Sequence, residues 1–197
     1  MTDRFYINDL WQIFDEADFL ITGSPKGVGF TTFVTEWAAE NMFLKEDYSI
    51  LILTKDRKTQ IDIIFKILEN YKYYHENGVE RDGNILYSLK KNLSVTGVFC
   101  YDEININEIY DFYDCIIIDS DDYSERLYKS IDHMMGITSK LIFNTYDVPQ
   151  SIFYNYPDAP KIVLTSEHNK KLKKKLSNTY SETVNFDRIL DGKFEEY

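Results

Sequence analysis

The chain has few residues of the types that build disulfide scaffolds, long irregular loops or zinc-type metal centres. Its 197 residues include only 2 Cys, 3 His, 4 Pro and 8 Gly. The two cysteines, Cys100 and Cys115, are not at metal-ligand spacing and stand beside apolar residues, so we expect buried thiols in a reducing compartment. The histidines are scattered, without a cysteine or acid at ligand spacing, and they predict no metal site.

Long apolar runs are also missing. No stretch approaches the ~18 uncharged apolar residues of a membrane span, and the first residues lack a basic region followed by an apolar run. We therefore expect no membrane contact and an intracellular location. With 44% hydrophobic and 16% aromatic residues, the composition is that of a chain that folds throughout, and its length fits one domain.

Positive charge is scarce, because the formal net charge is −11. An acidic chain does not attract nucleic acid over its whole surface, so any DNA contact must be local. The one concentrated basic run is HNKKLKKKL, residues 168–176. It is read either as a solvated helix face, which is the simpler interpretation, or as a phosphate-contacting patch. We expect a main domain over 1–166 and a basic helix and tail over 167–197.

Short β-rich runs alternate with longer segments of helical period along the chain. The pattern predicts strands at 19–22, 49–54, 115–119, 141–145 and 162–165, and helices at 31–44, 58–74, 105–112 and 123–135. In the helix over 58–74, Ile61, Ile64, Phe65 and Leu68 have the spacing of one buried stripe.

Strands such as CIII and KIVL are apolar on both faces, which is typical of a parallel sheet covered by helices on each side. The runs NILYSL and LSVTGVF, within 84–99, interrupt this rhythm and predict a small inserted β-hairpin. The predicted fold class is therefore α/β, a three-layer α/β/α sandwich with a mainly parallel central sheet.

The most distinctive segment is FLITGSPKGVGFTT, residues 19–32. An apolar strand, a glycine-rich turn and two threonines that open a helix are the parts of a phosphate-binding loop. The common pattern G-x-x-x-x-G-K-[ST] has a lysine before the threonine, but this chain has Phe30 there. The nearest lysine is Lys26, four residues earlier.

Lys26 has a compact charge on a four-carbon stem, which can reach phosphates from more than one anchor point. Gly27 and Gly29 would let backbone N–H groups face the phosphates, and Thr31 would offer its hydroxyl to magnesium. Thr32, which follows it at the head of the helix, is also expected among the nucleotide-binding residues. The alternative is that Lys26 is an exposed loop residue and that the glycines only form a strand-to-helix turn.

Three predicted strands end in residues suited to one nucleotide site, since ligands bind at the carboxyl ends of the strands in such sheets. One end carries the loop, a second carries Asp119 in IIIDSDDY, and a third carries Asn144 and Thr145 in LIFNTY. In nucleotide-hydrolysing P-loop proteins an aspartate at this place holds magnesium, directly or through water, near the loop threonine, here Thr31. The alternative is an ordinary buried strand that ends in an acid. Asn144 could sense a γ-phosphate or be a polar strand end.

Over roughly residues 5–166, the order and spacing of these motifs resemble the ATPases of phage large terminases, which drive DNA into capsids. SPKGVGFTT is similar to the phosphate loop of this family, CIIIDSDD to its acidic strand and SKLIFNTYD to its coupling strand. WQIF stands where the family has an adenine-contacting glutamine, here Gln12. Some family members carry the lysine early in the loop and an aromatic residue in its usual slot, as Lys26 and Phe30 do.

The resemblance implies a P-loop NTPase-type fold with ATP and Mg as cofactors, and Thr31 and Asp119 as the magnesium ligands. It implies double-stranded DNA, the portal and a nuclease subunit as partners, assembly of several copies into a ring, and the host cell cytoplasm as location. An arginine from the same or a neighbouring chain would complete the site, with Arg57, Arg81 and Arg126 as candidates.

Two features depart from the family pattern. Terminases follow the strand aspartate with a catalytic glutamate, but here Ser120 follows Asp119, so Asp121 is the remaining candidate beside Asp119 for a catalytic role. We expect Asp122 to cap the next helix. No nuclease domain follows within the 197 residues. The function that the resemblance implies is an ATP-binding motor domain that couples ATP to the translocation of double-stranded DNA. The alternative function is a degenerate P-loop scaffold that acts as a non-catalytic viral assembly or regulatory protein.

Overall fold

The computed structural model describes residues 11, 14–23, 29–74, 78–89, 93–120, 125–145, 156, 159 and 161–163. Its strands are β1 (Phe19–Gly23), β2 (Ser49–Thr54), β3 (Val79–Asp82), β4 (Ile85–Ser88), β5 (Val95–Cys100), β6 (Cys115–Ser120), β7 (Leu141–Thr145) and β8 (Lys161–Val163). Its helices are α2 (Phe30–Leu44), α3 (Arg57–Tyr74), α4 (Glu125–Lys129) and α5 (Ile131–Gly136), with a 3₁₀ turn η1 (Ile106–Glu108).

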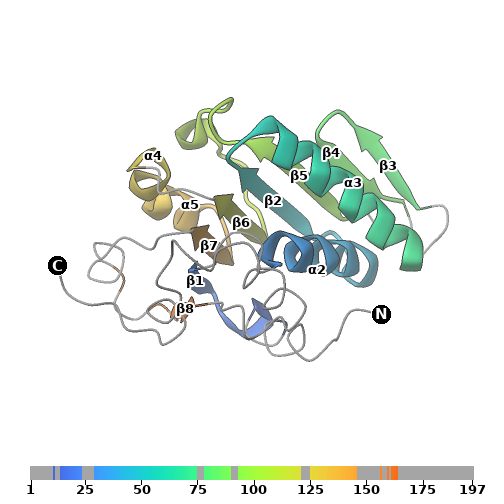
Figure 1. The fold of residues 1–197 in the computed structure, drawn as a ribbon, viewed down its shortest axis with the longest axis horizontal. Coiled ribbons are helices and arrows are strands. Elements are labelled where there is room, and N and C mark those ends of the chain that lie inside the picture. Colours follow the sequence, from blue (N-terminus) through green and yellow to red (C-terminus); the bar gives the residue numbers. More distant parts are fainter. Residues whose placement is uncertain are drawn as a thin grey trace, which may run out of the picture.

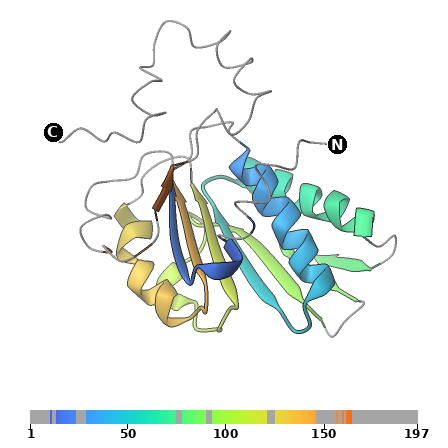
Figure 2. The ribbon, with the colours of Figure 1, turned by 90° about the horizontal axis from the view of Figure 1, so that it is seen from below.

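One eight-stranded sheet runs through the molecule in the order β3-β4-β5-β2-β6-β7-β1-β8 (Figure 1). The six strands from β5 to β8 in this order pair with one another in parallel. The two antiparallel pairings are β3 with β4 and β4 with β5. Figure 2 shows α2 and α3 on one face of the sheet and α4 and α5 on the other. The predicted three-layer α/β/α sandwich with a mainly parallel sheet is confirmed.

Each central strand contributes to two cores, because successive side chains of a strand point to opposite faces. On the α2/α3 face, strand residues such as Leu20 and Ile117 pack with Phe33 and Trp37 of α2. On the α4/α5 face, their chain neighbours pack with the apolar residues of α4 and α5. This alternation also decides on which side of the sheet each polar residue at a strand end lies.

The predicted hairpin is present, but one of its two strands is part of the main parallel sheet. β4 and β5 pair antiparallel, with Ile85 opposite Gly97. β5 also pairs in parallel with β2 along all six residues from Val95 to Cys100, so it belongs to the main sheet. The added piece is β3 with β4. We did not predict β3, since its sequence VERD has no apolar alternation and its last three residues are exposed at the edge.

The buried stripe of α3 differs from the predicted one. Ile64 is buried as expected, but Ile61 is 41% and Phe65 53% exposed. The buried face instead contains these residues: Gln60, Ile63, Ile64, Ile67 and Tyr71. Apolar residues are so frequent in this helix that either of two rotations about its axis would bury an apolar face. One rotation buries Gln60, whose Nε2 donates to the Val98 carbonyl oxygen at 2.7 Å.

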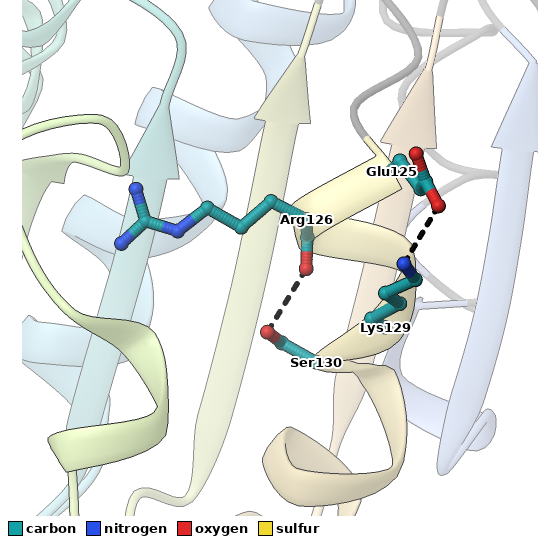
Figure 3. Close-up of polar contacts among 4 residues, drawn as sticks. All are labelled: Glu125, Arg126, Lys129 and Ser130. Atoms are coloured by element: carbon teal, nitrogen blue, oxygen red, sulfur yellow. Dashed lines mark hydrogen bonds and ion pairs between the residues drawn. The ribbon is translucent and has the colours of Figure 1, made fainter.

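The predicted helix over 123–135 is two short helices in the structure. α4 ends at Lys129 and α5 begins at Ile131, and the hydroxyl of Ser130 donates to the Arg126 carbonyl oxygen at 3.0 Å (Figure 3). A serine that bonds back to the preceding turn competes with the backbone bonds of a continuous helix. The predicted helix over 105–112 is reduced to η1.

Both cysteines are buried, as predicted, and neither forms a disulfide. Complete burial raises the pKa of the Cys115 thiol far above its ordinary range, so we expect an unreactive thiol. Among the described residues, no helix has the length and hydropathy to cross a membrane. The basic segment 167–197 lies outside them, so the proposed division of the chain at residue 166 stays a prediction.

Candidate functional site

Four polar side chains form a row across the carboxyl ends of four neighbouring strands. In the parallel register Thr22 of β1 is opposite Asn144 of β7, Asn144 is opposite Asp119 of β6, and Asp119 is opposite Thr54 of β2. All four are buried. They occupy the strand positions that point to the α2/α3 face, two residues beyond apolar members of that core. We call Thr22, Asn144, Asp119 and Thr54 the polar row.

Helix α2 begins beside this row. Its N-cap is Gly29 with φ 101° and ψ 11°, in the left-handed region that glycine adopts without a Cβ penalty. The cap has no side chain to satisfy the first N–H groups, and the first turn contains no acid. These N–H groups and the helix dipole favour an anion. The head of α2 is therefore electropositive.

Hydrogen bonds connect the helix to the row. The Thr31 hydroxyl donates to Asp119 Oδ2 at 2.6 Å, and Asn144 Nδ2 donates to Asp119 Oδ1 at 3.1 Å. The Thr22 hydroxyl donates to Asn144 Oδ1 at 2.8 Å. Three residues that the sequence singled out, Thr31, Asp119 and Asn144, thus lie together. Thr22 was missed, although it is the one polar residue in an apolar strand.

The chemistry of this cluster fits magnesium. A threonine hydroxyl and a carboxylate offer hard oxygen ligands close together, and Mg²⁺ in nucleotide sites takes few protein ligands and fills its other positions with water and phosphate oxygens. Across the described ranges there is no group of three His, Cys, Asp or Glu side chains that could hold a metal. Thr31 and Asp119 place two oxygen ligands of this kind within hydrogen-bond distance of each other.

Phe30, which stands where the common motif has lysine, is a core residue. It is 3% exposed and belongs to the core on the α2/α3 face. Its ring centroid lies 6.0 Å from that of Phe14, which is in turn 4.6 Å from Phe33. Phe30 therefore has a packing role in the core. Thr32, two positions on, is exposed.

Ser120 lies on the other side of the sheet from Asp119. It ends β6 opposite Thr145, is almost fully buried, and its hydroxyl is 3.3 Å from that of Tyr101. Tyr101 belongs to the core on the α4/α5 face. The residue after the strand aspartate is thus turned away from Thr31, which agrees with the absence of a catalytic base at this position.

Restoring a glutamate at this position is expected to damage the fold. In Ser120→Glu a longer carboxylate would be forced into a filled, buried space beside Tyr101, and we expect the free energy of unfolding in urea to fall by about 3 kcal/mol. Ser120→Ala, the control, should lose only about 1 kcal/mol, the value of one hydrogen bond. A Ser120→Glu protein of unchanged stability with faster ATP hydrolysis would contradict this placement.

Several predicted site residues lie outside the described residues: Gln12, Lys26, Gly27, Asp121 and Asp122. The three candidate arginines are described. Arg126 donates to the Ile104 carbonyl oxygen at 2.5 Å and extends away from the Glu125–Lys129 ion pair (Figure 3). Arg81 donates to the Gly83 carbonyl oxygen at 2.8 Å. Arg57 begins α3, three residues after Thr54 of the polar row.

No protein-family model and no curated protein matches the sequence. Solved structures do match. The large terminase of a thermophilic bacteriophage, in complex with ATP-gamma-S, superposes with a TM-score of 0.65 at 13% identity, covering 91% of this chain and 50% of that chain. The HK97 bacteriophage large terminase gives 0.62 at 11% identity, covering 83% of this chain and 39% of that chain.

The Thermus phage P74-26 large terminase ATPase domain gives a TM-score of 0.62 at 10% identity, covering 94% of this chain and 92% of that domain. This chain therefore spans about half of the terminase from the thermophilic bacteriophage but nearly all of a separate ATPase domain. At such low identity the likeness concerns the fold. The chain has the fold of the ATPase domain of phage large terminases.

Proposed function

We propose that this protein binds Mg-ATP at the polar row and serves as the motor domain of a viral DNA-packaging machine, coupling ATP to the translocation of double-stranded DNA. The observation that carries the proposal is the 2.6 Å hydrogen bond between Thr31 and Asp119. It joins, across 88 residues of sequence, the two side chains that were assigned to magnesium from sequence alone. The shared fold with terminase ATPase domains supports the same conclusion.

In this proposal each part of the site has one task. Lys26 and the N–H groups around Gly27 and Gly29 bind the phosphates, and Thr31 and Asp119 bind the magnesium ion, which neutralises phosphate charge when bound. Gln12 contacts the adenine. Asn144, hydrogen-bonded to Asp119, detects whether the γ-phosphate is present. Thr32 borders the loop from an exposed position.

The hydrolytic step needs a group that orients and deprotonates water. Ser120 does not supply it, because its hydroxyl faces Tyr101. Asp121 is the residue that we propose for this role, with an arginine from the same or a neighbouring copy (Arg57, Arg81 or Arg126) stabilising the transition state. DNA contact is local, through the basic run 168–176, and the portal and a nuclease subunit are the proposed partners in the host cytoplasm.

The burial of Phe30 and the orientation of Ser120 favour a second function. A protein that binds nucleotide without cutting it would need the phosphate loop, Thr31 and Asp119, but not a base. Such a protein would act as a non-catalytic viral assembly or regulatory factor. Hydrolysis assays with DNA and partner proteins separate the two functions, since only the motor releases phosphate.

The first test is nucleotide binding by Lys26→Ala. We expect the wild type to bind ATP-gamma-S in the presence of Mg²⁺ and the variant to bind ~10–100-fold more weakly, because it loses a charge-assisted hydrogen bond to phosphate. Calorimetry measures both. Lys72→Ala, which removes an exposed lysine in the last turn of α3, is the control and should bind as the wild type does. Absence of binding by the wild type at millimolar nucleotide would overturn the proposal.

A further inference from the structure

The order of the strands gives Asn144 a bridging position. β7 lies between β1, which leads into the phosphate loop, and β6, which ends in Asp119. The loop strand and the carboxylate strand are therefore not direct neighbours. In the polar row, side-chain contact between them passes through Asn144, which accepts from Thr22 on one side and donates to Asp119 on the other.

The chemistry of the three groups fixes which way the Asn144 amide points. A carboxylate only accepts hydrogen bonds, so it requires the NH₂ group of the amide. The Thr22 hydroxyl can then donate to the amide oxygen, so that every donor among Thr22, Asn144 and Asp119 meets an acceptor. A flipped amide would set its oxygen against Asp119 Oδ1 in a buried site, where the repulsion is strong. The hydrogen bond from Thr22 thus favours the same orientation of the Asn144 amide as the hydrogen bond to Asp119 does.

This arrangement determines which carboxylate oxygen of Asp119 faces the loop. Oδ1 is bound by Asn144, and Oδ2 is turned to the Thr31 hydroxyl at the head of α2. A carboxylate held by one oxygen presents the other without having to reorient when an ion binds beside Thr31. Outer partners that hold a ligand in this way affect metal affinity strongly although they never touch the metal.

We propose that Thr22 is a positioning residue for magnesium binding, which acts through the Asn144 amide to keep Asp119 Oδ2 directed at the helix α2 terminus beside Thr31. The inference rests on the proposed nucleotide site. A purely structural role would not need a hydroxyl, because Thr22 is fully buried in an otherwise apolar strand. Valine has the same shape and would fill that space without a polar group.

The chain offers a matched control. Thr96 of β5 is also a fully buried threonine in the same sheet, but its hydroxyl has no hydrogen-bond partner among the described residues. Thr96→Val makes the same chemical change as Thr22→Val at a position outside the polar row. Effects that come only from placing valine in this sheet would therefore be the same in both variants.

The experiment measures ATP-gamma-S affinity with Mg²⁺ and with EDTA for the wild type, Thr22→Val, Thr22→Ser and Thr96→Val. We expect Thr22→Val to lose ~10-fold or more of the affinity gained from Mg²⁺, in line with other outer-shell changes, while the affinity in EDTA stays unchanged. Thr22→Ser keeps the hydroxyl and should recover most of the magnesium effect. Thr96→Val should match the wild type.

A second readout uses the nucleotide-free protein. The side-chain NH₂ signals of Asn144, assigned by their disappearance in Asn144→Asp, should exchange slowly with solvent in the wild type and in Thr22→Ser, and faster in Thr22→Val. The inference is overturned if Thr22→Val shows the same magnesium effect as the wild type. It is also overturned if Thr22→Ser loses the magnesium effect as Thr22→Val does. Thr22→Ala replaces Thr22→Val in both measurements if the latter does not fold. Failure of the wild type to bind nucleotide refutes the proposed function instead.

Discussion

Replacing Asp119 by asparagine is expected to abolish the dependence of nucleotide binding on magnesium. The new amide has the same shape, but it must turn its oxygen toward the Asn144 NH₂ group and its own NH₂ group toward Thr31. A donor then occupies the place of a metal ligand. Because outer-shell changes already cost ~10–100-fold in metal affinity, loss of a ligand should cost at least as much.

The measurement is the ratio of ATP-gamma-S affinities with Mg²⁺ and with EDTA. In Asp119→Asn this ratio should fall to about one, because the magnesium-supported part of binding is lost. Asp62→Asn, on the exposed face of α3, removes the same charge away from the polar row and should leave the ratio unchanged. A ratio in Asp119→Asn equal to that of the wild type would remove Asp119 from the metal site.

Introducing the missing motif lysine is expected to harm the protein. In Phe30→Lys, an ammonium group replaces a ring that packs against Phe14 in the core. The loss of aromatic packing alone is worth about 3–5 kcal/mol, and the cation must in addition be buried or pull the first turn of α2 outward. We therefore expect the free energy of unfolding to fall by at least about 3 kcal/mol, without tighter nucleotide binding.

Urea unfolding and calorimetry test this prediction together. Thr32→Lys adds the same side chain at an exposed position of the same helical turn, where surface substitutions usually change stability by less than about 0.5 kcal/mol. A Phe30→Lys protein that is as stable as the wild type and binds ATP more tightly would mean that the aromatic residue is a substitute for lysine and not part of the core.

The sequence predicted best the parts of the molecule that depend on local patterns. The strand bounds at 49–54 and 141–145 were correct, because the apolar runs ILIL and LIF, flanked by polar residues, leave little choice. The meeting of Thr31, Asp119 and Asn144 followed from a topological rule about the carboxyl ends of parallel strands. Their chain positions alone gave no distances, and hydrogen-bond partners were not predicted.

The features that were missed depend on pairings between distant segments. The role of Thr22 can be inferred only when β7 is known to lie between β1 and β6. The spacing of residues along the sequence does not predict this strand order. The predicted α3 stripe was wrong at Ile61 and Phe65, because two rotations of an apolar-rich helix fit its sequence. The buried hydrogen bond from Gln60 to β5 goes with the observed rotation. The edge strand β3 has no apolar signal at all.

The central position of β7 also has a consequence during synthesis of the chain. Thr22 and Asn144 are separated by 122 residues, so β1 has left the ribosome long before its neighbour exists. Until residues 141–145 emerge, β1 and the facing edge of β6 carry unpaired backbone groups, which invite pairing with strands of other chains. Closing such a long loop is slow. We therefore expect nascent chains that stop before β7 to aggregate, and the nucleotide site to be among the last parts of the protein to form.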